Sequence, residues 1–374
     1  MKNSKSLCIL IPHWPTAIPG GAELQCYLIS EWLIKKQWKI EVISEGNKDF
    51  KSLNSRYYNN KIKYIFIKPY KLKTIGFFRI LISLLKTRSY FYYNRTDARL
   101  MRAVCIIYCK LFKKKSLYAI AHDDELIINN YADNIQKNRG LFYYLLKKAD
   151  AELFDKFSKQ FHFKADKIIS QTYDQQKQLN KKFNIQSEVI RNSIHVLPSN
   201  DFVKENIILW VGNMRPVKKP EIFLKMCNEL DLINWKFVVI GNTFDYGHRF
   251  EQLNLPNLEI LGQLSYEDTL EYFKKSKILV NTSQLEGFSN TFIQAWLFGL
   301  IVISLSVDPD DLLRNGLGYY CKNNFITLKH YVNLITETYD SSKQLLIKAK
   351  KFALKEFNLE NNMVKLEKLL KEIE

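Results

Sequence analysis

The sequence predicts an α/β protein with two consecutive parallel sheets, each covered by helices. Three observations favour this fold class. At 374 residues the chain is too long for one ordinary domain. From residue 6 onward, short apolar runs alternate with stretches of helical period, which is typical of parallel, helix-covered sheets. The alternation restarts after residue 206, beyond the polar and aperiodic stretch 193–206.

The first half opens with an apolar strand at 6–12, followed by the loop "HWPTAIPGGAE". One apolar helical face comes next, and a strand at 38–44 follows it. The residues that form this face, four or three positions apart, are Ala22, Cys26, Ile29 and Leu33. Further strands, separated by amphipathic helices, are expected at 63–67, 90–93, 117–121, 167–171 and 187–191.

The second half repeats this order, beginning with the strand "NIILWVGN" at 206–213. A helix near 220–230 comes next, and further strands are expected at 235–242, 257–264, 277–283 and 300–306. The chain ends in an amphipathic helix whose apolar side is predicted to hold Val364, Leu366, Leu369 and Leu370. We therefore expect a first domain at 1–197, a second at 198–356 and a terminal helical segment at 357–374.

The charge of the chain is high and unevenly distributed. The formal net charge is +18, and residues 61–115 hold fifteen lysines and arginines against one acid, Asp97. A basic surface rich in aromatic residues attracts polyanions, either nucleic acid or an anionic membrane face. A lysine-rich surface that is merely solvated is the simpler alternative. Because no nucleic-acid recognition motif is found, we expect no nucleic-acid partner.

No segment reads as a secretion signal or a membrane span. The apolar run 7–11 is too short for a signal peptide, and the longest apolar stretch, 74–85, contains Arg79. A cytoplasmic protein is therefore expected, with peripheral contact to the inner face of the membrane. The six cysteines show no CxxC spacing, so reduced structural thiols and no metal site are predicted.

The loop "NTSQLEGFSNTFIQAW" at 281–296 separates a buried strand from a helix that begins near Thr291. Ser289 or Asn290 suits the N-cap position, and Gly287 allows a tight turn and the close approach of a ligand. The N–H groups of the first helical turn, together with the helix dipole, suit a phosphate. Gln294 is expected on the side away from the apolar stripe, facing a cleft. This loop alone is equally compatible with a capped helix that binds nothing.

A second loop, "LWVGNMRPVKKP", favours the phosphate site over a capped helix that binds nothing. Its strand ends at Gly212, and Arg215 and Lys218 follow within six residues, while Lys219 is interpreted as solvated. Two cations just past the carboxyl end of a parallel strand favour a multiply charged ligand such as a diphosphate. The acidic "DPDD" at 308–311 is interpreted as a turn or a helix cap.

Two features of the first half of the chain are weaker evidence for a functional site. Gly20 and Gly21 in "PGGAE" open a helix, but a glycine pair alone is also an ordinary turn, and no GxGxxG motif supports dinucleotide binding. His122 in "YAIAHDDE" follows a strand end, where a structural role is the alternative to a functional one.

The motifs taken together resemble the retaining glycosyltransferases of family 4, in the group 1 glycosyltransferases. The resemblance rests on "GNMRPVK", "EGFSNT", "VDPDDLL", "PGGAE" and the stretch 164–194, and it is weakest at 50–115. It implies the GT-B fold, in which two Rossmann-like domains face a cleft and the C-terminal helix returns to the first domain. It also implies a nucleoside-diphosphate sugar as donor substrate, with no cofactor and no metal.

The resemblance assigns roles residue by residue. Arg215 and Lys218 would bind the donor diphosphate, Glu286 would lie by the sugar hydroxyls, and His122 would lie near the reacting carbon. These four form the expected catalytic set. Further donor contacts are implied for Gly20, Gly21, Gly212, Gly287, Phe288, Ser289, Asn290, Thr291 and, at the ribose, Gln294. The family usually has glutamate in place of Gln294, and losing that charged hydrogen bond costs on the order of 1 kcal/mol in donor binding.

The resemblance implies transfer of a sugar, with retention, to a glycan or lipid-linked acceptor in bacterial surface polysaccharide synthesis, such as capsule or O-antigen. Uridine diphosphate is the expected nucleotide because of its frequency in the family. Two alternatives stay open: a catalytically silent scaffold that binds nucleotide sugars, and a basic nucleic-acid-binding protein.

Overall fold

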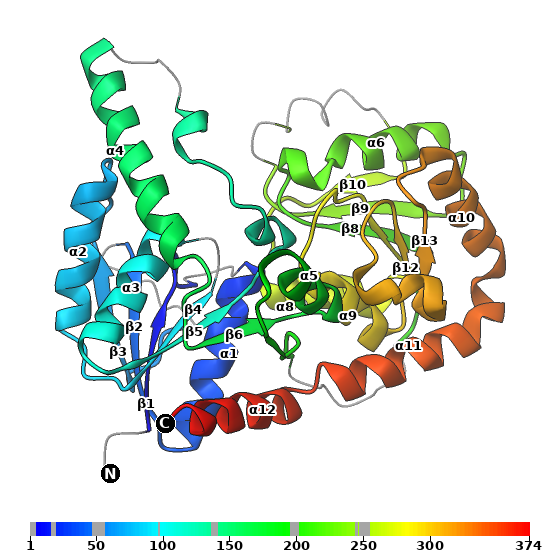
Figure 1. The fold of residues 1–374 in the computed structure, drawn as a ribbon. Coiled ribbons are helices and arrows are strands. Elements are labelled where there is room, and N and C mark those ends of the chain that lie inside the picture. Colours follow the sequence, from blue (N-terminus) through cyan, green and yellow to red (C-terminus); the bar gives the residue numbers. More distant parts are fainter. Residues whose placement is uncertain are drawn as a thin grey trace. The chain divides into compact units, whose positions relative to one another are not determined.

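A computed structural model describes residues 5–15, 20–46, 57–95, 98–135, 141–194, 202–243, 246 and 255–374. The chain divides into two compact units, the first of residues 1–191 with 360–374 and the second of residues 192–359. Each is a parallel sheet with helices on its faces, so the predicted fold class is confirmed (Figure 1). The expected domain boundary after residue 197 falls within 195–201, outside the described residues.

The described part of the first unit contains a seven-stranded sheet in the order β3-β2-β1-β4-β5-β6-β7, with every pair parallel. Its strands lie where the apolar runs predict them. They are β1 (Ser6–Leu10), β2 (Lys39–Glu45), β3 (Ile62–Ile67), β4 (Phe91–Arg95), β5 (Lys115–Ala119), β6 (Lys167–Ser170) and β7 (Glu188–Val189). Because all strands are parallel, the loops that follow them share one edge of the sheet, where ligands bind in open α/β folds.

Helices cover both faces of this sheet. Three of them, α2 (Lys73–Leu85), α3 (Arg99–Leu111) and α4 (Leu141–Phe161), pack together on one face, and α1 (Gly21–Lys35) lies on the other (Figure 1). The remaining helices are α5 (Tyr173–Phe183) and the short turns η2 (Asp123–Leu126) and η3 (Ala132–Asn134).

The last helix, α12 (Leu359–Glu372), packs on the first unit, as the fold predicts. The Trp32 indole N–H donates to Glu360 at 2.6 Å, and the Tyr90 hydroxyl donates to the carbonyl of Glu374 at 3.0 Å. One part of the prediction is wrong: Val364 is 52% exposed. Met363 takes its place on the buried side with Leu366, Leu369 and Leu370, because positions 363, 366 and 370 share one face at the helical period.

The second unit contains, in its described part, a six-stranded parallel sheet in the order β10-β9-β8-β11-β12-β13. Its strands are β8 (Ile207–Val211), β9 (Lys236–Ile240), β10 (Leu258–Ile260), β11 (Ile278–Asn281), β12 (Ile301–Ser304) and β13 (Tyr319–Tyr320). Its α-helices are α6 (Pro220–Glu229), α8 (Tyr266–Lys275), α9 (Asn290–Phe298), α10 (Phe325–Thr338) and α11 (Lys343–Glu356). Strand β13 was not predicted from the sequence.

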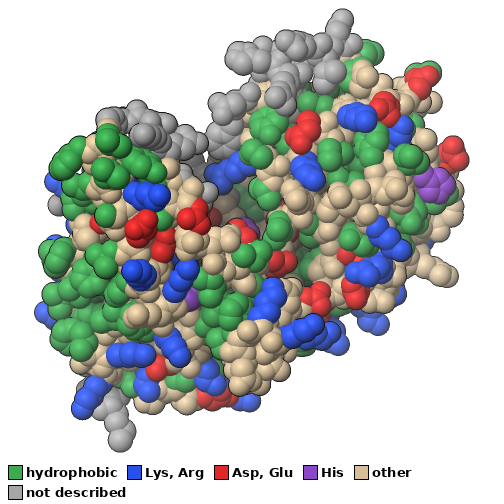
Figure 2. Space-filling model, turned by 45° about the horizontal axis from the view of Figure 1, so that its top comes forward, with side chains coloured by type: hydrophobic (Ala, Val, Ile, Leu, Met, Phe, Trp, Pro, Cys, Tyr) green, Lys and Arg blue, Asp and Glu red, His purple; other side chains and the backbone are tan. Residues whose placement is uncertain are grey.

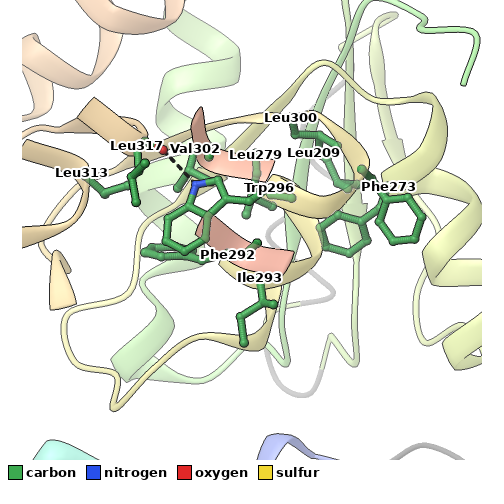
Figure 3. Packing of buried hydrophobic residues seen from close by; sticks show 14 of the residues in the cluster. Leu209, Phe273, Leu279, Phe292, Ile293, Trp296, Leu300, Val302, Leu313 and Leu317 are labelled. Carbon is green, nitrogen blue, oxygen red and sulfur yellow. Dashed lines mark hydrogen bonds between the residues drawn. The ribbon is translucent and has the colours of Figure 1, made fainter. Parts of the chain in front are cut away.

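Helix α9 is more deeply enclosed than its apolar stripe indicates. Phe292 and Trp296 pack into the core of the second unit, and the Trp296 indole N–H donates to the carbonyl of Leu317 at 2.8 Å (Figure 3). Gln294, expected on an open side of the helix, is only 6% exposed. The helix is buried nearly all round, and the rings of Phe288 and Phe357 pack against Trp296. Its first turn is therefore held firmly in place.

Two predictions about composition can be compared with the structure. All six cysteines are buried and have free thiols, as expected. Among the described residues, no helix combines the length and the apolar character that a bilayer span requires.

Candidate functional site

Two loops of the second unit are hydrogen-bonded together at the carboxyl ends of β8 and β11. The Trp210 indole N–H donates to the Thr282 hydroxyl at 2.9 Å, and this hydroxyl donates to the carbonyl of Lys218 at 2.7 Å. The backbone N–H of Gln284 donates to the carbonyl of Val217 at 2.8 Å. These bonds tie the loop after β8 to the loop after β11, and the side chains of Trp210 and Thr282 among them are buried.

Two of the residues predicted from the sequence meet there. The Lys218 ammonium lies 2.5 Å from Oε1 of Glu286, and the Ser283 hydroxyl donates to the same oxygen at 2.8 Å. Glu286 is buried, so its charge depends on this cation and this hydroxyl. Arg215 is exposed and precedes the one-turn helix η4 (Pro216–Lys218). The backbone N–H of Lys218 donates to the carbonyl of Arg215 at 2.8 Å.

The start of α9 is fixed by a residue that sequence reasoning missed. Asn192, which is buried, donates through its side-chain amide to the carbonyl of Phe288 at 3.2 Å and to Oδ1 of Asn290 at 2.8 Å. Ser289 is the N-cap residue, as predicted, but its hydroxyl pairs with that of Thr291 at 2.8 Å and does not bond a backbone N–H. The N–H of Phe292 donates to the carbonyl of Ser289 at 3.1 Å. The N–H groups before it, at the start of the helix, can face an anion.

Gln294 lies one turn further along α9. Its side-chain amide makes no hydrogen bond within the described part of the chain, although the residue is nearly enclosed. An amide both donates and accepts hydrogen bonds, so this position suits a ligand that supplies both an acceptor and a donor.

A second glycine lies against Gly212. Gly241, the first residue after β9, has a φ of +145°, and a Cβ built there would lie 2.0 Å from the carbonyl oxygen of Gly212. The N–H of Gly212 donates to the carbonyl of Ile240 at 2.9 Å. Sequence reasoning missed Gly241, although "VVIGN" ends its strand in the same way as "LWVGN".

Gly241→Ala is expected to lower the free energy of unfolding by about 2–5 kcal/mol, because both the backbone angle and the carbonyl of Gly212 oppose a methyl group. Chemical denaturation measures this. Gly262→Ala is the matched control: Gly262 also has a positive φ, of +66°, but a Cβ there meets nothing within 4 Å, so about 1 kcal/mol is expected. Equal losses for the two variants would contradict the role of the close approach.

In the first unit, His122 follows β5 on a turn that is built around a buried carboxylate. Glu125 accepts the N–H groups of Ala121 and His122, each at 2.8 Å, and the Tyr118 hydroxyl at 2.5 Å. The Arg102 guanidinium lies 3.8 Å from Glu125. Burial raises the pKa of Glu125, an effect that Arg102 opposes. The side chain of His122 itself is exposed.

The other predicted positions are placed as follows. Gly20 caps the start of α1 and Gly21 is its first residue, while Pro19 before them lies outside the described residues. Asp308 accepts the N–H of Leu313 at 2.7 Å and pairs with Arg314, so "DPDD" forms a turn and cap as predicted. Among the described residues no group of three or more His, Cys, Asp or Glu side chains is placed to hold a metal ion.

Comparison with known proteins finds a family match within the second unit. Residues 197–352 match the family model described as glycosyl transferases group 1. A curated relative, 27% identical over 185 residues, is the GalNAc-alpha-(1->4)-GalNAc-alpha-(1->3)-diNAcBac-PP-undecaprenol alpha-1,4-N-acetyl-D-galactosaminyltransferase of Campylobacter jejuni. The match covers 46% of this chain and 50% of the relative, and this chain spans about half the length of the curated relatives that it matches.

Solved structures share the fold over the whole chain. The structure of Anabaena Alr3699/HepE in complex with UDP-glucose has a TM-score of 0.74 at 15% identity and covers 98% of this chain and 99% of its own. Sucrose-phosphate synthase from Thermosynechococcus elongatus has a TM-score of 0.77 at 14% identity, covering 99% of both chains. At this identity the likeness shows the fold alone, and that fold is GT-B.

Proposed function

We propose that this chain is a glycosyltransferase that moves a sugar from a nucleoside-diphosphate sugar to a glycan or lipid-linked acceptor, with retention at the anomeric carbon. The observation that carries the proposal is the contact between Lys218 and Glu286, beside the start of α9, within the unit that matches the group 1 glycosyltransferases. Two relatives support the chemistry: one is named for a PP-undecaprenol acceptor, and one was solved with UDP-glucose.

The site can stabilise the leaving group. As the sugar departs, negative charge builds on the phosphate next to it, and stabilising that charge lowers the barrier. Lys218 has three N–H donors, of which Glu286 takes one, so the other two can bind phosphate oxygens. Arg215, three residues earlier, and the backbone N–H groups of residues 287–291 supply further positive charge and hydrogen-bond donors.

The remaining groups would orient the two substrates. Glu286 would accept hydrogen bonds from the sugar hydroxyls, and the side-chain amide of Gln294 would bind the ribose. In the first unit, His122 would lie near the reacting carbon and the acceptor. Gly20 and Gly21 would approach the donor phosphate. In this mechanism the departing phosphate accepts the proton of the acceptor hydroxyl, so no protein nucleophile is needed. The cellular role proposed is surface polysaccharide synthesis on the cytoplasmic side of an anionic membrane.

The glutamine at position 294 favours one competing function, a scaffold that binds nucleotide sugars without transfer. An amide accepts through only one of its two polar atoms, whereas the family's carboxylate accepts from both ribose hydroxyls. Both functions predict donor binding, and only the transferase predicts turnover of the donor.

Thermal unfolding in the presence of uridine, guanosine and adenosine diphosphate sugars tests the proposal. The true donor at a hundred times its Kd should stabilise the protein by about 2.7 kcal/mol. Consumption of that donor with a panel of glycan and lipid-linked acceptors then separates the two functions. Turnover that Glu286→Ala abolishes supports the transferase, whereas binding without turnover supports the scaffold. If no nucleotide sugar raises the melting temperature, both are wrong.

A further inference from the structure

Helix α2 exposes apolar side chains along its outer side. Ile75, Phe78, Ile82 and Leu85 recur at helical spacing and are all exposed, with Phe78 at 62%. The residues that α2 buries, Gly76, Ile80, Ser83 and Leu84, lie on its other side. A surface helix normally turns polar residues outward, so an apolar stripe on the outer side calls for a partner.

The start of α4 is also apolar and exposed. Leu141, Phe142, Leu145 and Leu146 are exposed, with Phe142 at 81%, and no residue from 141 to 149 is buried. Burial begins only at Ala151, so the first two turns extend beyond the packed body of the first unit (Figure 1). Tyr143 and Tyr144 are half-buried beside Lys147 and Lys148.

These two regions adjoin. The Asp150 carboxylate on α4 accepts the N–H groups of Lys73 and Thr74, at 2.5 and 3.0 Å, and so caps the start of α2. The rings of Phe77 and Phe157 pack edge to face with centroids 5.7 Å apart. The exposed residues 75, 78, 82 and 85 of α2 and 141, 142, 145 and 146 of α4 are named here the α2–α4 apolar surface. Figure 2 shows hydrophobic side chains gathered over the first unit, with basic side chains and also some acidic ones beside them.

The charge around this surface is positive. The sequence has no Asp or Glu from residue 57 to residue 96, nor from 141 to 149. Lys71 and Lys86 are exposed at the two ends of α2, and Lys147 and Lys148 follow the exposed turns of α4. The first acids on α4 are Asp150, which caps α2, and Glu152. A partner that binds this surface must therefore have a negatively charged outer layer and an apolar interior. An acidic lipid bilayer has both.

We propose that the α2–α4 apolar surface inserts into the headgroup region of an acidic lipid bilayer. Apolar insertion and the attraction of lysines to acidic lipids are each too weak alone for stable binding, and together they suffice. Tyrosines beside lysines are also typical of the membrane–water interface. This inference rests on the membrane contact within the proposed function and is independent of sugar transfer.

Vesicle flotation tests the inference with the full chain. Vesicles of phosphatidylcholine alone are compared with an equal mixture of phosphatidylcholine and phosphatidylglycerol. The protein should float with the mixture and only weakly with the neutral vesicles. The double variant F142S/L145S should bind the mixed vesicles about ten-fold or more weakly, because two large apolar side chains no longer enter the bilayer. Both positions are exposed, so folding should be unaffected, and an unchanged circular dichroism spectrum verifies this.

The matched control is I326S/I347S, which removes two exposed apolar residues from helices of the second unit and should float like the wild type. Equal losses in both double variants, or no binding of the wild type to acidic vesicles, would overturn the inference. So would a concentration-dependent dimer that F142S/L145S abolishes, since a second copy would then be the occupant. Nucleotide-dependent thermal stabilisation, measured on the same variants, reports on the donor site separately and should be unchanged by F142S/L145S.

Discussion

Lys218→Met is expected to lower kcat/KM for sugar transfer by about 10²- to 10³-fold, the range seen when one preorganised donor to a developing negative charge is removed. The Thr282 hydroxyl bonds the carbonyl of Lys218, so the backbone of this loop should keep its place in the variant. The loss should therefore come from the missing ammonium. Initial rates with the identified donor and acceptor measure it, and the larger share should appear in kcat because the charge develops in the transition state.

Lys219→Met is the matched control, because it removes the same charge one residue later. Lys219 is the N-cap residue of α6, and none of the contacts described between the loops after β8 and β11 involves its side chain. The kcat/KM of the Lys219→Met variant should stay within a few-fold of the wild-type value. A similar loss in both variants would indicate a general electrostatic effect and contradict a specific role for Lys218.

The Lys218→Met variant also tests a second role of the ion pair, the neutralisation of the buried Glu286 carboxylate. Without Lys218, the buried carboxylate of Glu286 loses the ammonium that lies 2.5 Å from it. The double variant Lys218→Met/Glu286→Gln should therefore melt at a higher temperature than Lys218→Met while staying inactive. Recovery of activity in the double variant would show that Lys218 only neutralises Glu286 and does not bind the donor.

Sequence reasoning found the loops of the site because their features are local. Glycines, cations and a capped helix following predicted strands place Gly212, Lys218 and Glu286 at one edge of a sheet before any coordinates are known. It also expected the strands of both sheets except β13, because buried parallel strands are continuous apolar runs. The terminal helix was assigned by its apolar pattern, with one residue placed on the wrong side.

The parts that were missed depend on contacts between distant segments. Asn192 bonds Phe288 and Asn290, nearly a hundred residues away, and no local pattern signals this. The close approach of Gly241 to Gly212 likewise exists only once β8 and β9 pair. The burial of Gln294 was missed for the same reason, since a helical wheel represents one helix and ignores the segments that pack around it.

Arg102→Met is expected to lower the free energy of unfolding by about 3–5 kcal/mol, because it leaves the buried Glu125 carboxylate without its cation. Arg102 is 1% exposed, its guanidinium stacks 3.9 Å from the centre of the Tyr118 ring, and Nη2 lies 2.9 Å from Nδ1 of His162. Methionine fills part of the space but supplies none of these contacts. Urea denaturation measures the loss, and Lys110→Met, an exposed position on the same helix, is the control and should change stability little.

The pH dependence distinguishes a lost cation from a simple packing defect. Burial raises the pKa of Glu125 in the folded state, and removing Arg102 raises it further. A carboxyl with a raised folded-state pKa favours the folded protein at low pH, and this contribution is lost as pH rises through that pKa. The deficit of Arg102→Met should therefore be smallest in acid and grow toward neutral pH. Adding Glu125→Gln should remove the pH dependence and restore part of the stability, whereas a deficit independent of pH would mean that packing alone accounts for the loss.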